Sequence, residues 1–135
     1  MTRWVCPRCD REFGRERQSH VCVPGVTVEA VFAPWPEAYR EIYDRLVEPL
    51  GPLGPLHEDA VGVGVFLKAE RKFAEIRPKA RSLQVEITLA RPIAHPLLAR
   101  SFAMGSGRYA HFFKLTRPED VDGRILEWMA EAYDA

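Results

Sequence analysis

The sequence predicts an α+β domain preceded by a small cysteine-containing segment, and three patterns support this prediction. The cysteines, 3 in all, lie within the first 22 of 135 residues. Apolar and polar residues alternate at positions 83–89, as in a strand with one buried face. Apolar residues recur at helical spacing before and after the strand region. The expected domain is a helix, an antiparallel sheet of about four strands and a second helix.

The cysteine segment is predicted to be a zinc finger. Cys6 and Cys9 are separated by two residues, a spacing that lets both thiolates bind one metal ion. His20 and Cys22 complete a set of three sulfur ligands and one nitrogen ligand, which suits tetrahedral zinc. Phe13, between the pairs, is placed to cover the site. Four protein ligands fill the coordination shell, so we expect one structural Zn²⁺ per chain. A redox dithiol is the weaker interpretation, because no strand-helix-strand pattern surrounds it.

The chain divides after the last cysteine, where a proline and a glycine follow each other. Residues 1–23 are therefore expected to form the zinc finger, and residues 24–135 the α+β domain. Residues 26–32 alternate weakly and are predicted to be an extended arm. A helix is predicted over 34–50, because proline is tolerated in its first turn and apolar residues recur at helical spacing. The glycine- and proline-rich run at 51–55 ends it.

Four strands are predicted after this helix. In the first strand, at 60–67, Gly62 and Gly64 share a face, so a helix or a ligand is expected to come close to that face. Both helices are expected on one face of the sheet, with the other face partly open, because polar residues alternate along the third strand. The other strands are expected at 73–77, 83–89 and 109–115, with a charged hairpin loop at 68–72.

The last helix has its own start signal. Thr116 and Glu119 fit a capping box, and Pro118 falls in the first turn. Its expected buried stripe consists of Val121, Ile125, Trp128, Met129 and Ala132.

Charge and composition limit the function classes. Acidic and basic residues balance at 19 each, so no global field draws the chain to nucleic acid or to an anionic membrane. No apolar run approaches the roughly 20 residues of a membrane span, and the N-terminus has no signal-peptide core. An odd number of cysteines argues against a closed disulfide framework. A cytoplasmic location without membrane contact is therefore expected.

A metal-dependent nuclease is the first enzyme interpretation to weigh. Asp59, followed by Glu70 and Lys72, imitates the carboxylates and lysine of the restriction-type nuclease core. That geometry requires Glu70 and Lys72 on a rigid central strand. The pattern places them in the hairpin loop instead, which disfavours a nuclease.

The histidines and serines form no recognisable catalytic pattern. His57, His95 and His111 are far apart in the sequence, and no role can be assigned to them. His111 alternates with two aromatic residues, which favours a satisfied core histidine. Ser101 lies shortly before a Gly-Ser-Gly run, and Ser106 is the serine of that run, which lacks the strand-turn-helix setting of a nucleophile or phosphate loop. This run is predicted to be a flexible loop.

A cluster of basic residues is the remaining candidate site. Residues 68–81 carry a local excess of four positive charges, and the finger adds five arginines against three acids. If hairpin and finger share a side of the molecule, they form a basic surface with aromatic side chains nearby. A solvated loop of alternating charge is the competing interpretation. The candidate anion- or nucleic-acid-binding residues are Lys68, Arg71, Lys72, Arg77, Lys79 and Arg81.

The chain also resembles a bacterial family in which a zinc finger precedes a conserved domain of the domain-of-unknown-function 5655 type. Relatives of this domain occur alone or fused to proteins linked with restriction systems or predicted transport. The resemblance implies no catalytic residues, and no mechanism follows from it. The residues that carry it are Trp4, Cys6, Cys9, Phe13, Gln18, His20 and Cys22, then 64–68, 71–79, Arg91-Pro92, His95-Pro96, Ala99-Arg100, 110–112, 120–122 and 128–133.

These patterns favour a non-enzymatic cytoplasmic zinc protein that acts as an accessory module binding nucleic acid or another ligand. The open sheet face and the basic hairpin are the expected contact surfaces, and nucleic-acid binding is expected to be weak and indifferent to sequence. A protein-protein adaptor that docks through the finger and Trp35 is the alternative. An enzyme with a small-molecule pocket near Gly62 and Gly64 has least support. The partner and the oligomeric state do not follow from the sequence.

Overall fold

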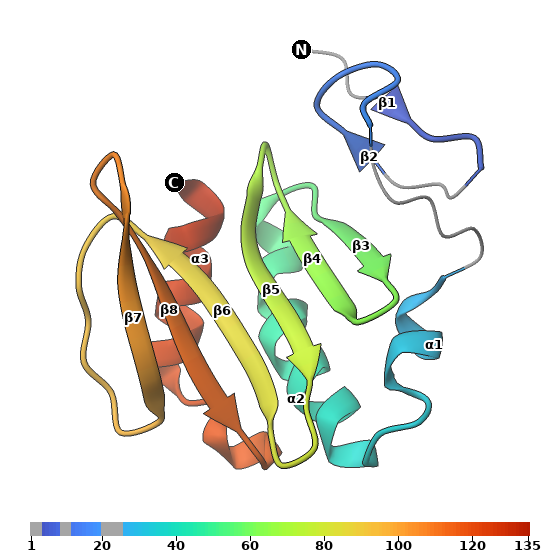
Figure 1. Cartoon of the computed structure of the whole chain (residues 1–135). Helices are drawn as coiled ribbons and strands as arrows, with labels where there is room; N and C mark the ends of the chain where they lie inside the picture. Colours follow the sequence, from blue (N-terminus) through green and yellow to red (C-terminus); the bar gives the residue numbers. More distant parts are fainter. Residues whose placement is uncertain (1–3, 9–11, 20–25) are drawn as a thin grey trace.

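The structure, a computed structural model, describes residues 4–8, 12–19 and 26–135. Its main body is a six-stranded antiparallel sheet in the order β3-β4-β5-β6-β8-β7 (Figure 1). The α+β prediction is confirmed, with more strands than expected. The strands are β3 His57–Val61, β4 Gly64–Lys68, β5 Lys72–Pro78, β6 Leu83–Leu89, β7 Leu98–Gly105 and β8 Arg108–Leu115; the α-helices are α1 Val28–Phe32, α2 Glu37–Val47 and α3 Gly123–Asp134.

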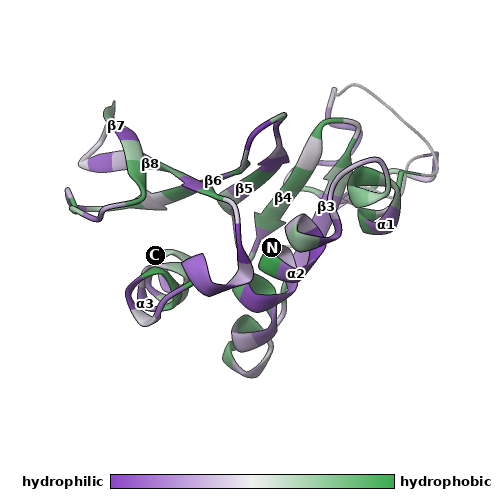
Figure 2. Cartoon of the chain, turned by 90° about the horizontal axis from the view of Figure 1, so that it is seen from below, coloured by the Kyte–Doolittle hydropathy of each residue, from purple (hydrophilic) through white to green (hydrophobic). Residues whose placement is uncertain are grey.

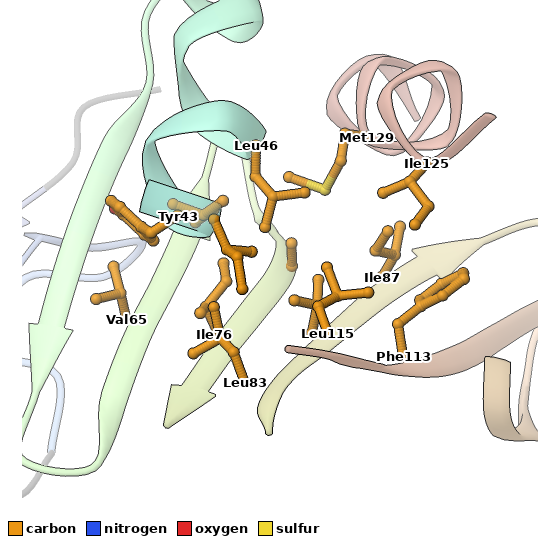
Figure 3. Packing of buried hydrophobic residues seen from close by; sticks show 14 of the residues in the cluster. Tyr43, Leu46, Val65, Ile76, Leu83, Ile87, Phe113, Leu115, Ile125 and Met129 are labelled. Atoms are coloured by element: carbon orange, nitrogen blue, oxygen red, sulfur yellow. The ribbon is translucent and has the colours of Figure 1, made fainter. Parts of the chain in front are cut away.

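Helices α2 and α3 lie on the same face of the sheet, as predicted (Figure 2). The alternation of apolar and polar residues along β6 explains why both helices cover one face. Four apolar side chains of this strand are buried under the helices, namely Leu83, Val85, Ile87 and Leu89, while Gln84 and Glu86 between them are half-buried. The buried side chains of β6 pack with those of the two helices in one continuous core (Figure 3). Within the described part of the chain, none of the helices is long and apolar enough to cross a membrane.

The first predicted strand is in fact two strands, and the prediction at 60–67 was wrong. Residues 62 and 63 form the turn between β3 and β4, which pair from His57↔Lys68 to Val61↔Gly64. Val63 is 60 % exposed in this turn. Alternating valine and glycine continue through the turn, so the sequence pattern contains no break that would mark it.

The segment at 26–32 contains helix α1, Val28–Phe32, which corrects the prediction of an extended arm. Thr27 is the N-cap of α1, and its side chain accepts a hydrogen bond from the backbone N–H of Ala30 at 3.1 Å. Val31 and Phe32 are buried in the core. The next helix, α2, ends near its predicted boundary but continues as the 3₁₀ helix η1, Glu48–Leu53. The proline at 52 therefore lies inside a tighter helix rather than after its end.

Strand β7 was not predicted, and the Gly-Ser-Gly run is a hairpin turn rather than an open loop. Gly105, Ser106 and Gly107 all have positive φ, at 86°, 54° and 73°. Such dihedrals make the tight connection between β7 and β8. Seven of the eight residues of β7 are exposed, because this edge strand extends beyond the helices. A strand without a buried face needs no alternation of apolar and polar residues, so the sequence pattern did not predict it.

The last helix starts later than predicted. Asp122 is the N-cap of α3 and accepts a hydrogen bond from the N–H of Ile125 at 3.0 Å. The predicted first turn is a separate 3₁₀ helix, η2 Pro118–Asp120. Asp120, not Glu119, bonds to the backbone N–H and the hydroxyl of Thr116. The predicted stripe is confirmed for Ile125, Trp128, Met129 and Ala132; Val121 is also buried but lies before the helix begins.

Candidate functional site

The predicted finger is described in part. Strand β1, Trp4–Val5, pairs with β2, Glu12–Phe13. Cys6 directly follows β1, is 4 % exposed and packs with Phe13 and Trp4. A buried cysteine after a strand and before a turn fits a zinc knuckle covered by an aromatic ring. Cys9, His20 and Cys22 lie outside the described residues, so the four-ligand zinc site stays a prediction.

A polar contact joins this N-terminal hairpin to the main sheet. The Lys68 ammonium donates to the Asp59 carboxylate at 2.8 Å and to the Glu12 carbonyl at 3.1 Å. It also lies 5.3 Å from the centre of the Phe13 ring. Nδ1 of His57 is 3.4 Å from the Glu12 carboxylate. Because Asp59 is 1 % exposed, its charge requires the partner that Lys68 supplies. Lys68 therefore positions the hairpin rather than facing solvent as an anion-binding group.

The other five predicted basic residues do not form one surface. Lys72 and Arg77 both form ion pairs with Glu75, the lysine at 3.0 Å. Arg71 is exposed in the β4-β5 turn, while Lys79 and Arg81 are exposed after the far end of β5. A strand of 7 residues separates the two ends, which corresponds to roughly 20 Å.

The residues of the nuclease interpretation also fail to converge on a site. Asp59 belongs to the edge strand β3 and pairs with Lys68. Glu70 lies in the β4-β5 turn. Lys72, the first residue of β5, pairs with Glu75. Glu70 lies in the turn as predicted, whereas Lys72, also predicted in the hairpin loop, belongs to β5; the two residues therefore do not share a strand.

Two of the histidines have complete hydrogen-bonding arrangements. His95 accepts the Leu97 N–H at Nδ1 and therefore donates from Nε2 to Asp122, at 3.0 and 2.7 Å. Its ring joins the β6-β7 loop to the start of α3 and has no nitrogen left for catalysis. His111 is 0 % exposed and contacts Ser101 and the Arg91 carbonyl through its two nitrogens. The prediction of a satisfied core histidine is confirmed for His111.

Among the described elements, no helix covers the second face of β5, β6, β8 and β7 (Figure 2). Strand pairing creates a row of side chains across this face. Because strands alternate sides, the row belongs to the face opposite the buried residues of β6. It runs from β4 to β7 through Phe66, Glu75, Glu86, Phe112 and Arg100. We call it the outer row.

A hollow of about 270 Å³ lies at the β7 end of the outer row. The Arg100 guanidinium is 4.6 Å from the centre of the Phe112 ring and 5.3 Å from that of Phe102. The two rings meet edge to face at 5.3 Å. Cation–π contact holds the guanidinium over the rings while its N–H groups can still bind a ligand. The hollow is lined by Gln84, Ala99, Arg100, Phe112 and Lys114.

Glu86, next to this hollow, is a half-buried carboxyl group. Burial raises its pKa, the neighbouring Glu75 raises it further, and Lys72, Arg77 and Arg100 oppose the rise. Lys72 and Arg77 already bond to Glu75. Arg100 is therefore one of three cations that offset the charge of Glu86, and it is the one on the β7 side.

Part of this site could be found in the sequence. Phe112 and Lys114 lie on the predicted strand at 109–115 and alternate with its buried residues. Their outward direction follows from that alternation. Arg100 and Phe102 lie on β7, which was not predicted. No sequence signal connected these two residues to Phe112, because the pairing of β7 with β8 is a tertiary contact.

Comparison with known proteins places this fold in a family. The family model described as domain of unknown function (DUF5655) matches residues 28–135. The chain belongs to this family. The match starts at α1 and excludes the N-terminal hairpin. No curated protein and no solved structure matches the chain.

Proposed function

We propose that this protein is a binding module whose helix-free sheet face binds single-stranded nucleic acid. The hollow at the β7 end carries the proposal, since an aromatic ring, a guanidinium, an ammonium and an amide converge on it. Proteins that bind single strands combine stacking rings with cations that contact the phosphate backbone. The site differs from the predicted basic hairpin, whose charges are largely paired or separated.

The charges of the hollow favour a polyanion. Within the described residues, neither Arg100 nor Lys114 forms a side-chain ion pair with a carboxylate. Both are exposed, so a phosphate can approach them without breaking a side-chain ion pair, while Arg100 also offsets the charge of Glu86. With two such cations, binding should be weak and should lose affinity with salt at a log-log slope of about 1.4, at roughly 0.7 per phosphate contacted.

Fluorescence anisotropy with a labelled single-stranded oligonucleotide at low salt tests this proposal. Arg100→Gln and Lys114→Gln should each weaken binding several-fold and reduce the salt slope by about one contact. Arg45→Gln is the matched control, because Arg45 is an exposed arginine on α2, on the other side of the sheet. Equal losses for Arg100→Gln and Arg45→Gln, or no binding at low salt, would reject the proposal.

A protein-protein adaptor remains the alternative, with less support at its predicted position. Trp35 stacks on Tyr39 with ring centres 6.1 Å apart and packs against the core. Its half-buried ring is therefore explained by packing within the domain. The exposed side chains of Phe102 and Met104, at 49 % and 55 %, lie on the edge strand β7. If oligonucleotides do not bind, this edge becomes the surface on which to test protein partners.

A further inference from the structure

The inference concerns a serine and a histidine that face each other on strands β7 and β8. Ser101 and His111 are register partners in this strand pair. The serine hydroxyl oxygen lies 2.7 Å from His111 Nδ1, and His111 Nε2 lies 2.9 Å from the Arg91 carbonyl oxygen. Three groups thus form one hydrogen-bonded chain: hydroxyl, imidazole and carbonyl. Ser101 lies on strand β7, which the sequence did not predict.

The hydrogen-bond chain determines where the protons are when the imidazole is neutral. A carbonyl oxygen only accepts hydrogen bonds, so Nε2 of His111 must carry the ring proton. Nδ1 then carries a lone pair and no proton, so it accepts a hydrogen bond from the Ser101 hydroxyl. This arrangement leaves the oxygen lone pairs of Ser101 pointing away from the imidazole. A donating hydroxyl with a neutral imidazole oriented by a third group is the arrangement found in activated serine nucleophiles.

Ser101 and His111 differ in their exposure to solvent. His111 is 0 % exposed, whereas Ser101 is an exposed residue on the edge strand of the sheet. The base is therefore shielded from bulk water, whereas the serine that carries the nucleophilic oxygen is an exposed residue. We propose that Ser101 is a nucleophile activated by His111 and that it is acylated by small carboxylic esters. The proposal is independent of the nucleic-acid function, because it uses different side chains.

The reaction balances with the two residues, the ester and one water molecule. The Ser101 oxygen attacks the ester carbonyl carbon, and its proton passes to Nδ1 of His111. The tetrahedral intermediate expels the alkoxide, which takes that proton and leaves as an alcohol. Water then attacks the acyl-serine with the imidazole as base, which releases a carboxylic acid and restores the hydroxyl. Ester and water are the only reactants.

The surroundings predict a slow reaction. The group that orients His111 is the Arg91 carbonyl, which carries a partial charge and stabilises an imidazolium less than a carboxylate does. β7 is the edge strand of the described sheet, so its backbone N–H groups that point away from β8 are the candidate donors for the oxyanion. The expected result is stoichiometric acylation with slow turnover.

The first experiment treats the full-length protein with p-nitrophenyl acetate and maps the acetyl group by peptide mass spectrometry. We expect acetyl on Ser101 and an initial release of nitrophenol close to one equivalent per chain. Ser101→Ala should abolish both. Ser106→Ala is the control, because Ser106 is an exposed serine in the adjoining turn. Acetyl found on Ser106 or on lysines to the same extent as on Ser101 overturns the proposal.

A second experiment tests the role of His111 without replacing this buried side chain. Ser101→Cys and Ser106→Cys are compared for their rate of alkylation by iodoacetamide at neutral pH, with peptide mapping to separate the native cysteines. An imidazole that accepts the proton lowers the thiol pKa, so Ser101→Cys should react at least about tenfold faster. Equal rates, or a slower rate for Ser101→Cys, would show that His111 does not activate this position.

Discussion

Substitution of Gly64 by alanine tests the close packing of β4 against β5. A Cβ atom at this position would lie 2.3 Å from the Ile76 carbonyl oxygen and 3.0 Å from Cγ of Arg77. The carbonyl belongs to the backbone of β5, so it cannot move without disturbing strand pairing. Overpacking of this kind costs about 1–3 kcal/mol, and a backbone obstacle favours the upper end.

The expected effect on the melting temperature follows from chain length. An unfolding entropy of about 2.1 cal/mol/K per residue amounts to about 0.28 kcal/mol/K for a chain of 135 residues. A loss of about 3 kcal/mol then lowers the melting temperature by about 10 °C. Differential scanning calorimetry measures this shift directly.

The matched control is Gly62→Ala, two residues away. An added Cβ at Gly62 meets nothing within 4 Å, and the residue lies in the exposed turn. This change should alter stability by no more than about 1 kcal/mol. A melting temperature for Gly64→Ala within about 2 °C of the parent would show that β4 and β5 are not packed as described. It would also reopen the sequence-based idea of a ligand pocket beside these glycines.

Three further predictions concern the core, the outer row and the metal. Leu89→Ala should cost about 2–5 kcal/mol in denaturant unfolding, and Gln84→Ala should cost little, because the two side chains face opposite sides of β6; similar losses would mean that the faces are exchanged. Since burial raises the pKa of Glu86, Glu86→Gln should raise the melting temperature at neutral pH. This gain should disappear as the pH falls and the carboxyl protonates, and a gain that is independent of pH would contradict the assignment. Elemental analysis should find one zinc per chain, and Cys22→Ser should lose it; full zinc retention by that variant would refute the ligand set.

The sequence predicted those parts of the fold in which local pattern and burial agree. Strand β6 has the predicted bounds, Leu83–Leu89, because both its neighbours and the helices enforce its alternation. Helix α3 has the predicted buried stripe for the same reason. Strand β7 is the opposite case: it lies at an edge, most of its residues are exposed, and its pairing with β8 is specified by the hairpin turn rather than by hydrophobic period.

The basic residues show a second limit of the sequence. Charges counted along 68–81 suggested one positive surface, but a count does not include acids that fold against them. Glu75 lies between Lys72 and Arg77 and pairs with both. Asp59 comes from another strand and pairs with Lys68. These acids are buried, so the partners were fixed by the tertiary structure and could not be deduced from spacing alone.

Alternation along β7 explains how one short strand can serve two separate sites. Arg100 pairs with Phe112 in the outer row, and the next residue, Ser101, pairs with the buried His111. Successive strand residues point to opposite faces of a sheet. A ligand in the hollow and an ester at Ser101 would therefore approach the same strand from different sides. Substitutions at Arg100 should leave acylation unchanged, because its side chain lies over the Phe112 and Phe102 rings, whereas His111 bonds to Ser101 and the Arg91 carbonyl. A joint loss of both activities would instead indicate that β7 itself had detached from β8.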